Sequence, residues 1–249
     1  MKKIASLSIA VLMLAFMFPG KKKIKIFLAG DSTMSIKETK AYPETGWGMP
    51  FVYFWDSTVT IVNKAKNGRS TKSFITEGLW KSIMDEASEG DYIFIQFGHN
   101  DEVPTKKTYT TEDEFRNNLI KYIDEARGKK AIPILLTPVA RRKFDSAGTT
   151  SGTHEVYSAI VRAVAADKNV PLIDTDKKSQ QLYQQFGMEN SKLLFLQLKP
   201  GEHPNYPDGK EDNTHFNEFG ARLIAQIILK EIKELKMELA ERIIVSVKK

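Results

Sequence analysis

The chain has 249 residues, 41% of them hydrophobic and 27% charged, and its formal net charge is +6. These proportions are ordinary for a soluble globular protein and exclude a largely disordered chain. The absence of cysteine excludes disulfides, thiolate metal sites and a cysteine nucleophile.

The first twenty residues have the pattern of a secretory signal peptide. Met1-Lys2-Lys3 is a short positive stretch, and an apolar run over residues 4–18 follows it. That run has about the length of a signal-peptide core and is too short to span a membrane comfortably. We therefore expect residues 1–20 to be removed near Pro19-Gly20, and the mature protein to be secreted or periplasmic without stable membrane association. A buried helix or a membrane anchor is the alternative.

After residue 20, short apolar runs alternate with amphipathic stretches. The apolar runs predict strands over residues 24–28, 59–62, 92–97, 132–136 and 170–173. Spacings of three and four between apolar residues predict helices over residues 112–127, 155–167, 175–186 and 219–239. Continuous apolar strands suit a parallel sheet covered on both faces. The alternation predicts one doubly wound domain with α/β/α layers, over residues 21–249.

Reactive and hydrogen-bonding residues follow four of the five predicted strands, and another such group lies near the C-terminus. The groups are Gly30-Asp31-Ser32-Thr33-Met34, Asn67-Gly68-Arg69-Ser70, Gly98-His99-Asn100-Asp101, Thr137-Pro138-Val139-Ala140-Arg141-Arg142 and Asp212-Asn213-Thr214-His215. Doubly wound sheets bind ligands at the carboxyl ends of their strands. We therefore expect these groups to form one site, beside a loop over residues 199–210 that shapes the cleft.

The residues of these groups could carry out acyl transfer, which needs a nucleophile, a base, a residue that orients the base and donors for an oxyanion. Ser32, at a strand-to-helix turn, could be the nucleophile, with His215 as the base and Asp212 orienting it. Gly68 can present its backbone N–H with no side chain in the way. The Asn100 amide and the Ser32 N–H could be further donors. Each motif alone is more simply a turn or a structural histidine; their combination in one α/β frame favours catalysis.

This combination resembles the SGNH hydrolase superfamily, also called GDSL-like lipases and acylhydrolases. The four residues that name the superfamily match Ser32, Gly68, Asn100 and His215. The resemblance extends from residue 24 into the last predicted helix.

Further motifs narrow the resemblance to rhamnogalacturonan acetylesterases. They are Gly30-Asp31-Ser32-Thr33-Met34, Gly46-Trp47-Gly48, Asn67-Gly68-Arg69-Ser70, Phe97-Gly98-His99-Asn100-Asp101 and Thr137-Pro138-Val139-x-Arg141-Arg142. The resemblance implies deacetylation of a galacturonate-rich pectin backbone through an acyl-enzyme, without a cofactor. It also implies a flavodoxin-like fold with a five-stranded sheet in the order 2-1-3-4-5. Asn67 is a departure, because a second glycine is often found there.

Other side chains are candidates for supporting roles. Arg141 and Arg142 could pair with substrate carboxylates, because a guanidinium fork matches a carboxylate; an internal salt bridge is the alternative. Trp47, in a loop between glycines, could stack on a sugar. We expect Asp31 to accept hydrogen bonds from loop N–H groups, and His99 to pack beside the site and form a hydrogen bond. His154 and His203 are expected on the surface.

The expected partner is an acetylated polysaccharide or oligosaccharide, bound by a monomer; no clustered basic patch indicates nucleic acid. Xylan, another glycan or a lipid ester is the alternative substrate. A metal phosphoesterase would draw its ligands from Asp31, His99, Asp101, Asp212 and His215, but no H-x-x-x-H or D-x-H spacing is present, and no metal is expected. A glycan-binding protein without activity is the non-enzymatic alternative. The G-x-S-x-G motif of α/β-hydrolases is absent.

Overall fold

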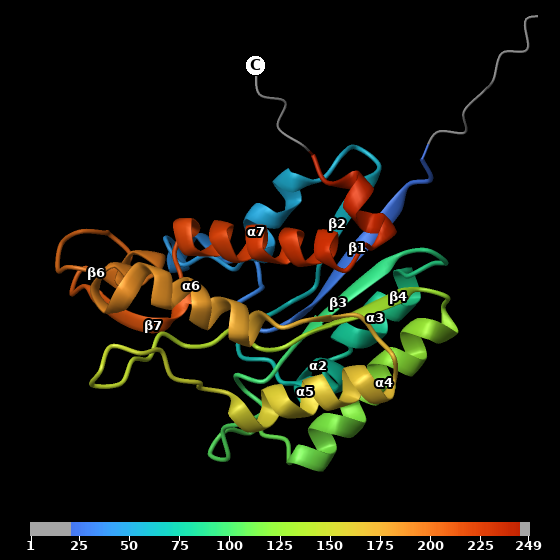
Figure 1. The fold of residues 1–249 in the computed structure, drawn as a ribbon, viewed down its shortest axis with the longest axis horizontal. Coiled ribbons are helices and arrows are strands. Elements are labelled where there is room, and N and C mark those ends of the chain that lie inside the picture. The colour runs from blue at the N-terminus through green and yellow to red at the C-terminus, as the bar shows by residue number, and fades with distance from the viewer. Residues whose placement is uncertain (1–20, 245–249) are drawn as a thin grey trace, which may run out of the picture.

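A five-stranded parallel sheet forms the centre of the computed structural model, which describes residues 21–244 (Figure 1). The strands are β1 (Ile24–Gly30), β2 (Val59–Asn63), β3 (Tyr92–Gln96), β4 (Ile132–Leu136) and β5 (Leu172–Ile173). Their order is β2-β1-β3-β4-β5 with every neighbouring pair parallel. This confirms the predicted doubly wound sheet. The predicted signal peptide lies outside the described residues.

Helices cover both faces of the sheet. One layer contains α2 (Thr71–Thr76), α3 (Leu79–Glu86), α4 (Glu112–Gly128) and α5 (Glu155–Asp167). The other contains α1 (Gly48–Phe51), α6 (Thr175–Asn190) and α7 (Glu218–Glu234). Within the described residues, four short 3-10 helices complete the helical structure: η1 (Thr39–Ala41), η2 (Val52–Phe54), η3 (Ser191–Leu194) and η4 (Glu238–Arg242).

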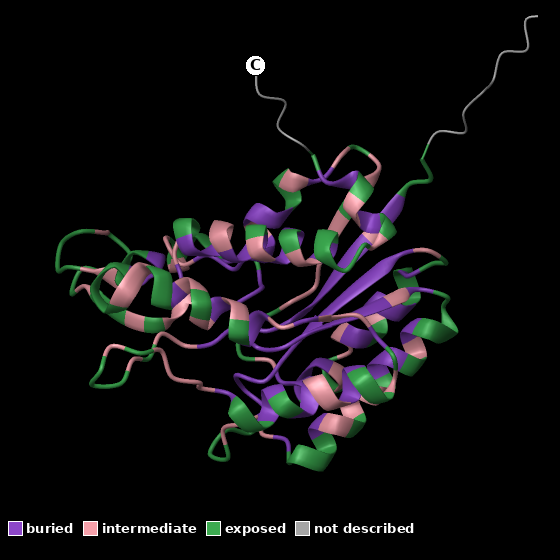
Figure 2. Ribbon diagram, viewed as in Figure 1, coloured by how far each residue is buried: buried purple, intermediate pink, exposed green. Residues whose placement is uncertain are grey.

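The two helical layers enclose two hydrophobic cores, one on each side of the sheet. Successive residues of a strand point to opposite faces, so Ile26 and Leu28 of β1 enter the α7 side, whereas Phe27 and Ala29 enter the α4 side. All four side chains are completely buried. This double burial explains why the strands read as continuous apolar runs, and it makes the sheet the buried centre seen in Figure 2.

A small antiparallel ribbon lies beside the main sheet and was not predicted. It consists of β6 (Phe195–Leu198) and β7 (Lys210–Phe216). The first five residues of β7 are all polar or charged, and His-Phe follows them, so no apolar pattern marked it as a strand. Residues 199–209 of the predicted loop over residues 199–210 connect the two strands, and Lys210 begins β7.

Other differences from the predicted elements are small and have local causes. The predicted strand over residues 170–173 shrinks to two residues, because Pro171 has no N–H to give to a ladder. The predicted last helix stops at Glu234, and Lys236 just beyond it has a left-handed φ of 52°. The helices α2 and α3 were not predicted; they have only six and eight residues, too short for a clear period.

None of the helices in the part of the chain from residue 21 to residue 244 is long and apolar enough to cross a membrane.

Candidate active site

Two different structural elements bring the predicted catalytic residues together. Ser32 lies in the turn after β1, at the carboxyl edge of the sheet, whereas Asp212 and His215 belong to β7. The β6–β7 ladder pairs Phe195 with Phe216 and then Gln197 with Glu211. A two-residue step on β6 therefore faces a five-residue step on β7, so residues 212–215 bulge out of the ladder. Bulges of this kind re-aim side chains, and this one turns the Asp-His pair towards Ser32.

A continuous chain of hydrogen-bonding atoms joins the three side chains. His215 Nε2 lies 3.0 Å from Ser32 Oγ, and His215 Nδ1 lies 2.8 Å from Asp212 Oδ2. The other oxygen, Asp212 Oδ1, accepts hydrogen bonds from the backbone N–H groups of Thr214 (2.7 Å) and His215 (2.9 Å). This arrangement suits a neutral imidazole that donates from Nδ1 and keeps its Nε2 lone pair for the serine hydroxyl.

Asp212 is held in its ionised form. Burial alone would raise its pKa, but the hydrogen bond and charge of His215 and the two backbone N–H groups outweigh burial and hold the pKa of Asp212 at about 2. A carboxylate that stays charged at neutral pH can stabilise a positive imidazolium. The geometry is therefore that of a serine nucleophile with an oriented base.

The turn that carries Ser32 is rigidly built. Asp31 is completely buried, and its Oδ1 accepts hydrogen bonds from the Thr33 N–H (2.9 Å) and the Thr33 hydroxyl (2.8 Å). These are the loop contacts expected of Asp31. Burial raises the pKa of Asp31, and the contacts from Thr33 oppose that rise. A Cβ on Gly30 would lie 2.9 Å from the Gln96 carbonyl oxygen and 2.7 Å from Met34 Sδ, so a glycine is needed where this turn begins.

The predicted oxyanion donors lie in the loops after β2 and β3. Gly68 has a φ of +77° and is exposed, a backbone conformation that favours glycine. Its loop is tied to β1 by a hydrogen bond from the Lys66 N–H to the Gly30 carbonyl (3.0 Å). Asn100 is buried; its Nδ2 donates to the Arg69 carbonyl (3.1 Å), and its Oδ1 accepts from Lys106 Nζ (2.9 Å). An amide nitrogen has two hydrogens, so Asn100 keeps one for another acceptor.

Trp47 does not lie where a sugar could reach it, so the prediction that it stacks on substrate is wrong. The side chain is completely buried, its Nε1 donates to Gln96 Oε1 (2.8 Å), and its ring packs edge-on against Phe51. The flanking glycines explain this position. A Cβ on Gly46 would lie 2.1 Å from the Ser35 carbonyl oxygen, so the glycines let the loop pack closely against the nucleophile turn and place Trp47 in the core.

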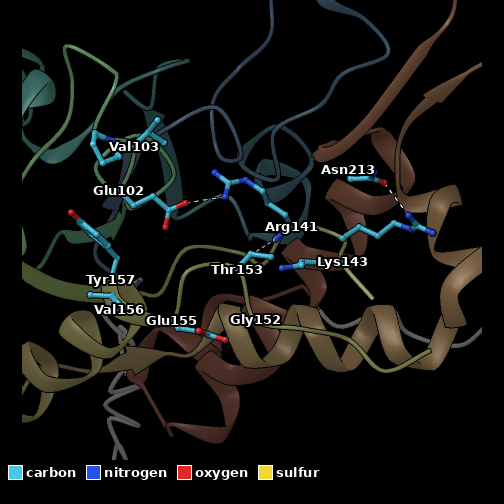
Figure 3. A pocket seen from close by; sticks show the side chains of 12 residues that line it. Glu102, Val103, Arg141, Lys143, Gly152, Thr153, Glu155, Val156, Tyr157 and Asn213 are labelled. Carbon is cyan, nitrogen blue, oxygen red and sulfur yellow. Dashed lines mark hydrogen bonds and ion pairs between the residues drawn. The ribbon is translucent and has the colours of Figure 1, made fainter. Parts of the chain in front are cut away.

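Arg141 and Arg142 line a cavity of about 710 Å³ next to the β7 bulge (Figure 3). Arg141 points towards Glu102 and forms an ion pair with it at 2.9 Å, with 31% of its side chain exposed. Arg142 donates to Ser191 Oγ (2.9 Å), to Asn213 Oδ1 (3.0 Å) and to the Met188 carbonyl. Arg142 therefore fixes the bulge, while Arg141 retains donors on the cavity side. The expected contacts of both with substrate stay predictions.

Two histidines pack together behind the site. His99 is buried as expected, with its ring centre 4.2 Å from that of His154, but neither of its ring nitrogens has a hydrogen-bond partner among the described residues. Burial, followed by the neighbouring His154, Arg141 and His215, holds the pKa of His99 well below its usual value. His99 is therefore a neutral packing group.

His154 was expected on the surface, and that prediction is wrong. It is 1% exposed, and its Nδ1 lies 2.9 Å from Glu102 Oε2. Glu102 therefore joins His154 to Arg141. Nothing in the sequence marks this network, because Arg141 and His154 lie 39 and 52 positions from Glu102 and the three residues match no motif.

Sequence reasoning also missed two charged residues at the site, Lys37 and Glu44. Lys37 Nζ lies 2.7 Å from Glu44 Oε1, and that oxygen lies 4.0 Å from His215 Nε2. Charged residues in a loop usually face solvent, so no signal in the sequence distinguished this pair.

Among residues 21–244, no group of three or more His, Cys, Asp or Glu side chains is arranged to hold a metal ion.

The chain is similar to known proteins in both sequence and fold. Residues 29–223 match the sequence model of the GDSL-like Lipase/Acylhydrolase family. The chain is 43% identical over 225 residues to rhamnogalacturonan acetylesterase RhgT of Bacillus subtilis (strain 168), covering 90% of this chain and 96% of RhgT. It is 34% identical over 221 residues to the probable rhamnogalacturonan acetylesterase YesY of the same strain, covering 88% and 97%. The crystal structure of Bacillus subtilis YxiM superposes with a TM-score of 0.76 at 27% identity, over 87% of this chain and 58% of that chain.

Proposed function

This chain belongs to the GDSL-like lipase/acylhydrolase family, and from that premise we propose that it is a serine esterase that removes acetyl groups from rhamnogalacturonan. The observation that carries the proposal is the chain of contacts from Ser32 Oγ through His215 to Asp212, at 3.0 and 2.8 Å. The two acetylesterase relatives support the substrate, since both align with this chain over nearly their whole length.

In the proposed reaction, His215 Nε2 takes the proton of the Ser32 hydroxyl as Oγ attacks the acetyl carbonyl carbon. The carbonyl oxygen becomes an oxyanion, which the N–H groups of Ser32 and Gly68 and the free amide hydrogen of Asn100 stabilise. The sugar oxygen leaves with the proton from His215, and the acetyl group stays on Ser32. Water, deprotonated by His215, then attacks the acetyl-enzyme and releases acetate. Asp212 holds the imidazole and stabilises its positive form.

The cavity next to the β7 bulge is the proposed site of the polymer. Asn213, which follows Asp212, lines this cavity together with Arg141 and Lys143. The three cationic lining residues, Arg141, Arg142 and Lys143, outnumber the two acidic ones, Glu102 and Glu155. This positive balance suits uronate carboxylates, and the partly exposed Arg141 could bind one. An acetylated xylan or another acetylated glycan is the second candidate, because the catalytic residues would serve either polymer.

We propose that the enzyme is secreted or periplasmic, since its polysaccharide or oligosaccharide substrate comes from outside the cell, and that it acts as a monomer. In that arrangement residues 1–20 act as the signal peptide. Sequencing the N-terminus of the exported protein tests this part, and a mature chain that still begins at Met1 would contradict it.

The first experiment measures acetate release from acetylated rhamnogalacturonan and acetylated xylan by wild type and Ser32→Ala. Release from the pectic polymer alone, abolished by the substitution, supports both the mechanism and the substrate. Equal release from xylan keeps the serine esterase and removes the pectin preference. Full activity of Ser32→Ala would exclude the serine mechanism.

A further inference from the structure

A buried lysine, Lys37, contacts the turn that carries the proposed nucleophile, and the acyl-transfer steps above do not use it. The side chain of Lys37 has no exposed surface, which is rare for lysine unless its charge is paired. Burial lowers the pKa of Lys37, and the carboxylates of Glu44, Asp31 and Asp212 oppose that shift. The role of this buried charge lies in the groups that Lys37 contacts.

Lys37 joins the two turns that carry the proposed oxyanion donors. Its Nζ donates to the Ser32 carbonyl (2.5 Å) and to Asn67 Oδ1 (2.8 Å), and it lies 2.7 Å from Glu44 Oε1. Two of the three ammonium hydrogens are therefore donated to these two turns, and the contact with Glu44 is an ion pair. Because Asn67 directly precedes Gly68, Lys37 fixes the distance between the Ser32 turn and the Gly68 loop. This contact also gives the departure at Asn67 a role, since a glycine there has no side-chain oxygen to accept from Lys37.

Glu44 extends the contact to the base. Its Oε1 lies 4.0 Å from His215 Nε2, the nitrogen that faces Ser32, and only 13% of its side chain is exposed. The next residue, Thr45, donates its N–H to the Phe216 carbonyl at 2.8 Å, which ties this loop to the end of β7. His215 therefore has one carboxylate at each end of its ring, Asp212 at Nδ1 and Glu44 near Nε2.

We propose that Lys37 and Glu44 act as one pair of positioning residues for the esterase reaction. Lys37 holds the two oxyanion turns together, and Glu44 stabilises the imidazolium from its Nε2 side while Lys37 limits how strongly it does so. This inference rests on the proposed function, because it assigns roles around the same serine and histidine.

Other charged or titratable groups also lie near Lys37, Glu44 or His215, and their charges stay unchanged when the pair is altered. They are Asp212 on the same strand, Asp31 behind Ser32, His99 after β3, and Tyr206 in the β6–β7 connection near Glu44 and Asp212. None of them carries a compensating positive charge at the Nε2 edge in the way that Lys37 does. Removing one member of the pair therefore changes the net charge that His215 experiences.

The two single variants should move the pH profile in opposite directions. In Glu44→Gln, Lys37 is left as an uncompensated positive charge that disfavours the imidazolium, so the acid limb of kcat/KM moves to lower pH. In Lys37→Met, Glu44 is left as an uncompensated negative charge, so the acid limb moves to higher pH. Lys37→Met should also lower kcat by roughly 10²-fold, the scale of effect expected when reacting groups are misplaced by about 1 Å. KM should change much less than kcat.

A matched control lies in the same loop. Glu38 and Lys40 form an ion pair at 2.7 Å, but their side chains are 74% and 84% exposed. Glu38→Gln and Lys40→Met make the same chemical changes without touching the site, so both should leave kcat and the pH profile unchanged.

The experiment follows the rate at which a fluorophosphonate labels Ser32 and the rate of para-nitrophenyl acetate hydrolysis, each as a function of pH. Wild type, Glu44→Gln, Lys37→Met, the double variant and the two controls are compared, and circular dichroism verifies that each is folded. Opposite shifts in the single variants, with a double variant near the wild-type profile, support the pair. Shifts in the same direction, or no shift in either folded variant, overturn it. If Lys37→Met fails to fold, Glu44→Gln decides alone by shifting to lower pH or not.

The labelling of Ser32 distinguishes an error about the Lys37–Glu44 pair from an error about the proposed function. Labelling of wild type but not of Ser32→Ala establishes the serine and its base whatever the natural ester is. If wild type is labelled and the shifts are absent, only the pair is wrong. If wild type is not labelled, the serine mechanism fails, and the pair fails with it.

Discussion

The two halves of the candidate active site are held in place by different means. The Ser32 half grows out of the buried sheet: Asp31 is completely buried, and the glycines around the turn allow no added Cβ. The His215 half lies on a small ribbon, with 28% of the histidine side chain exposed. It depends on a few hydrogen bonds, including those from Arg142 to Ser191 and Asn213. The contacts that position Ser32 therefore also stabilise the fold, whereas the contacts that position His215 belong to the ribbon.

This difference separates stability from activity. Changes in the Ser32 half should reduce the free energy of unfolding together with turnover, because the same contacts serve both. Changes in the His215 half should reduce turnover and leave the free energy of unfolding nearly unchanged. Five predictions test or sharpen this division.

The largest effect is expected from His215→Ala. Loss of the base should reduce kcat by roughly 10⁴- to 10⁶-fold, while the melting temperature changes little because the side chain is partly exposed. Ester hydrolysis and thermal unfolding monitored by circular dichroism provide the two measurements. A large loss of stability would show that the ribbon is part of the cooperative core.

Asn100→Ala should lower kcat by roughly 10²- to 10³-fold, the usual cost of one oxyanion donor. Because Asn100 also bridges Arg69 and Lys106 in the Ser32 half, the free energy of unfolding should decrease as well. Steady-state kinetics and chemical denaturation measure the two effects. Unchanged turnover would remove Asn100 from the oxyanion hole.

Asp101 should make the Ser32 half less stable as pH rises. Burial raises its pKa to about 7, against the hydrogen bonds from Thr71 and Thr110. Since this folded value lies above the unfolded one, the folded state binds the proton more tightly, and the free energy of unfolding falls between about pH 4 and pH 7. The full span corresponds to at most about 4 kcal/mol, at about 1.4 kcal/mol for each pKa unit.

The test for Asp101 is urea denaturation of wild type and Asp101→Asn at several pH values. The difference in the free energy of unfolding between the two should change in favour of Asp101→Asn as the pH increases through this window. A difference that is constant with pH would show that Asp101 does not titrate there.

Gly46→Ala should reduce the free energy of unfolding by about 1 to 3 kcal/mol, the usual cost of overpacking. The added Cβ would lie 2.1 Å from the Ser35 carbonyl oxygen, so the nucleophile turn has to move and turnover should fall as well. Gly128→Ala is the matched control, because a Cβ there meets no atom within 4 Å. Intact activity in a destabilised Gly46→Ala would show that the turn and the core are independent.

The smallest effect is expected from Arg142→Gln. Loss of its contacts to Ser191 and Asn213 should loosen the β7 bulge and lower kcat about tenfold, within the range expected for small misplacements of catalytic groups. Stability should change by less than about 1 kcal/mol, as for most surface changes. Arg222→Gln, which breaks an exposed helix ion pair with Glu218, serves as the control. Equal turnover in both variants would mean that the bulge keeps its shape without Arg142.

The same division explains which parts of the fold and the site could be predicted from the sequence. Strands buried on both faces, such as β1 and β3, are apolar throughout, and their carboxyl ends carry recognisable motifs, so the doubly wound sheet and Ser32 were predictable. The strand order came from the family resemblance that these motifs carry. The polar β7 has no such pattern, and its bulge depends on pairing with β6 through contacts that are distant in sequence. Trp47 and His154 were misplaced because burial of a loop residue is decided by tertiary packing. Lys37 and Glu44 were missed for the same reason.

One consequence follows from the contact between Ser32 and His215, which are separated by 183 positions in the chain. A contact of this separation closes almost the whole described chain into a loop, and contacts of that kind form late and slowly in folding. The reactive pair cannot exist in a nascent or partly folded chain that lacks β7. The rate at which esterase activity returns during refolding should therefore measure how fast the C-terminal ribbon packs against the sheet. Activity would mark the last step of folding.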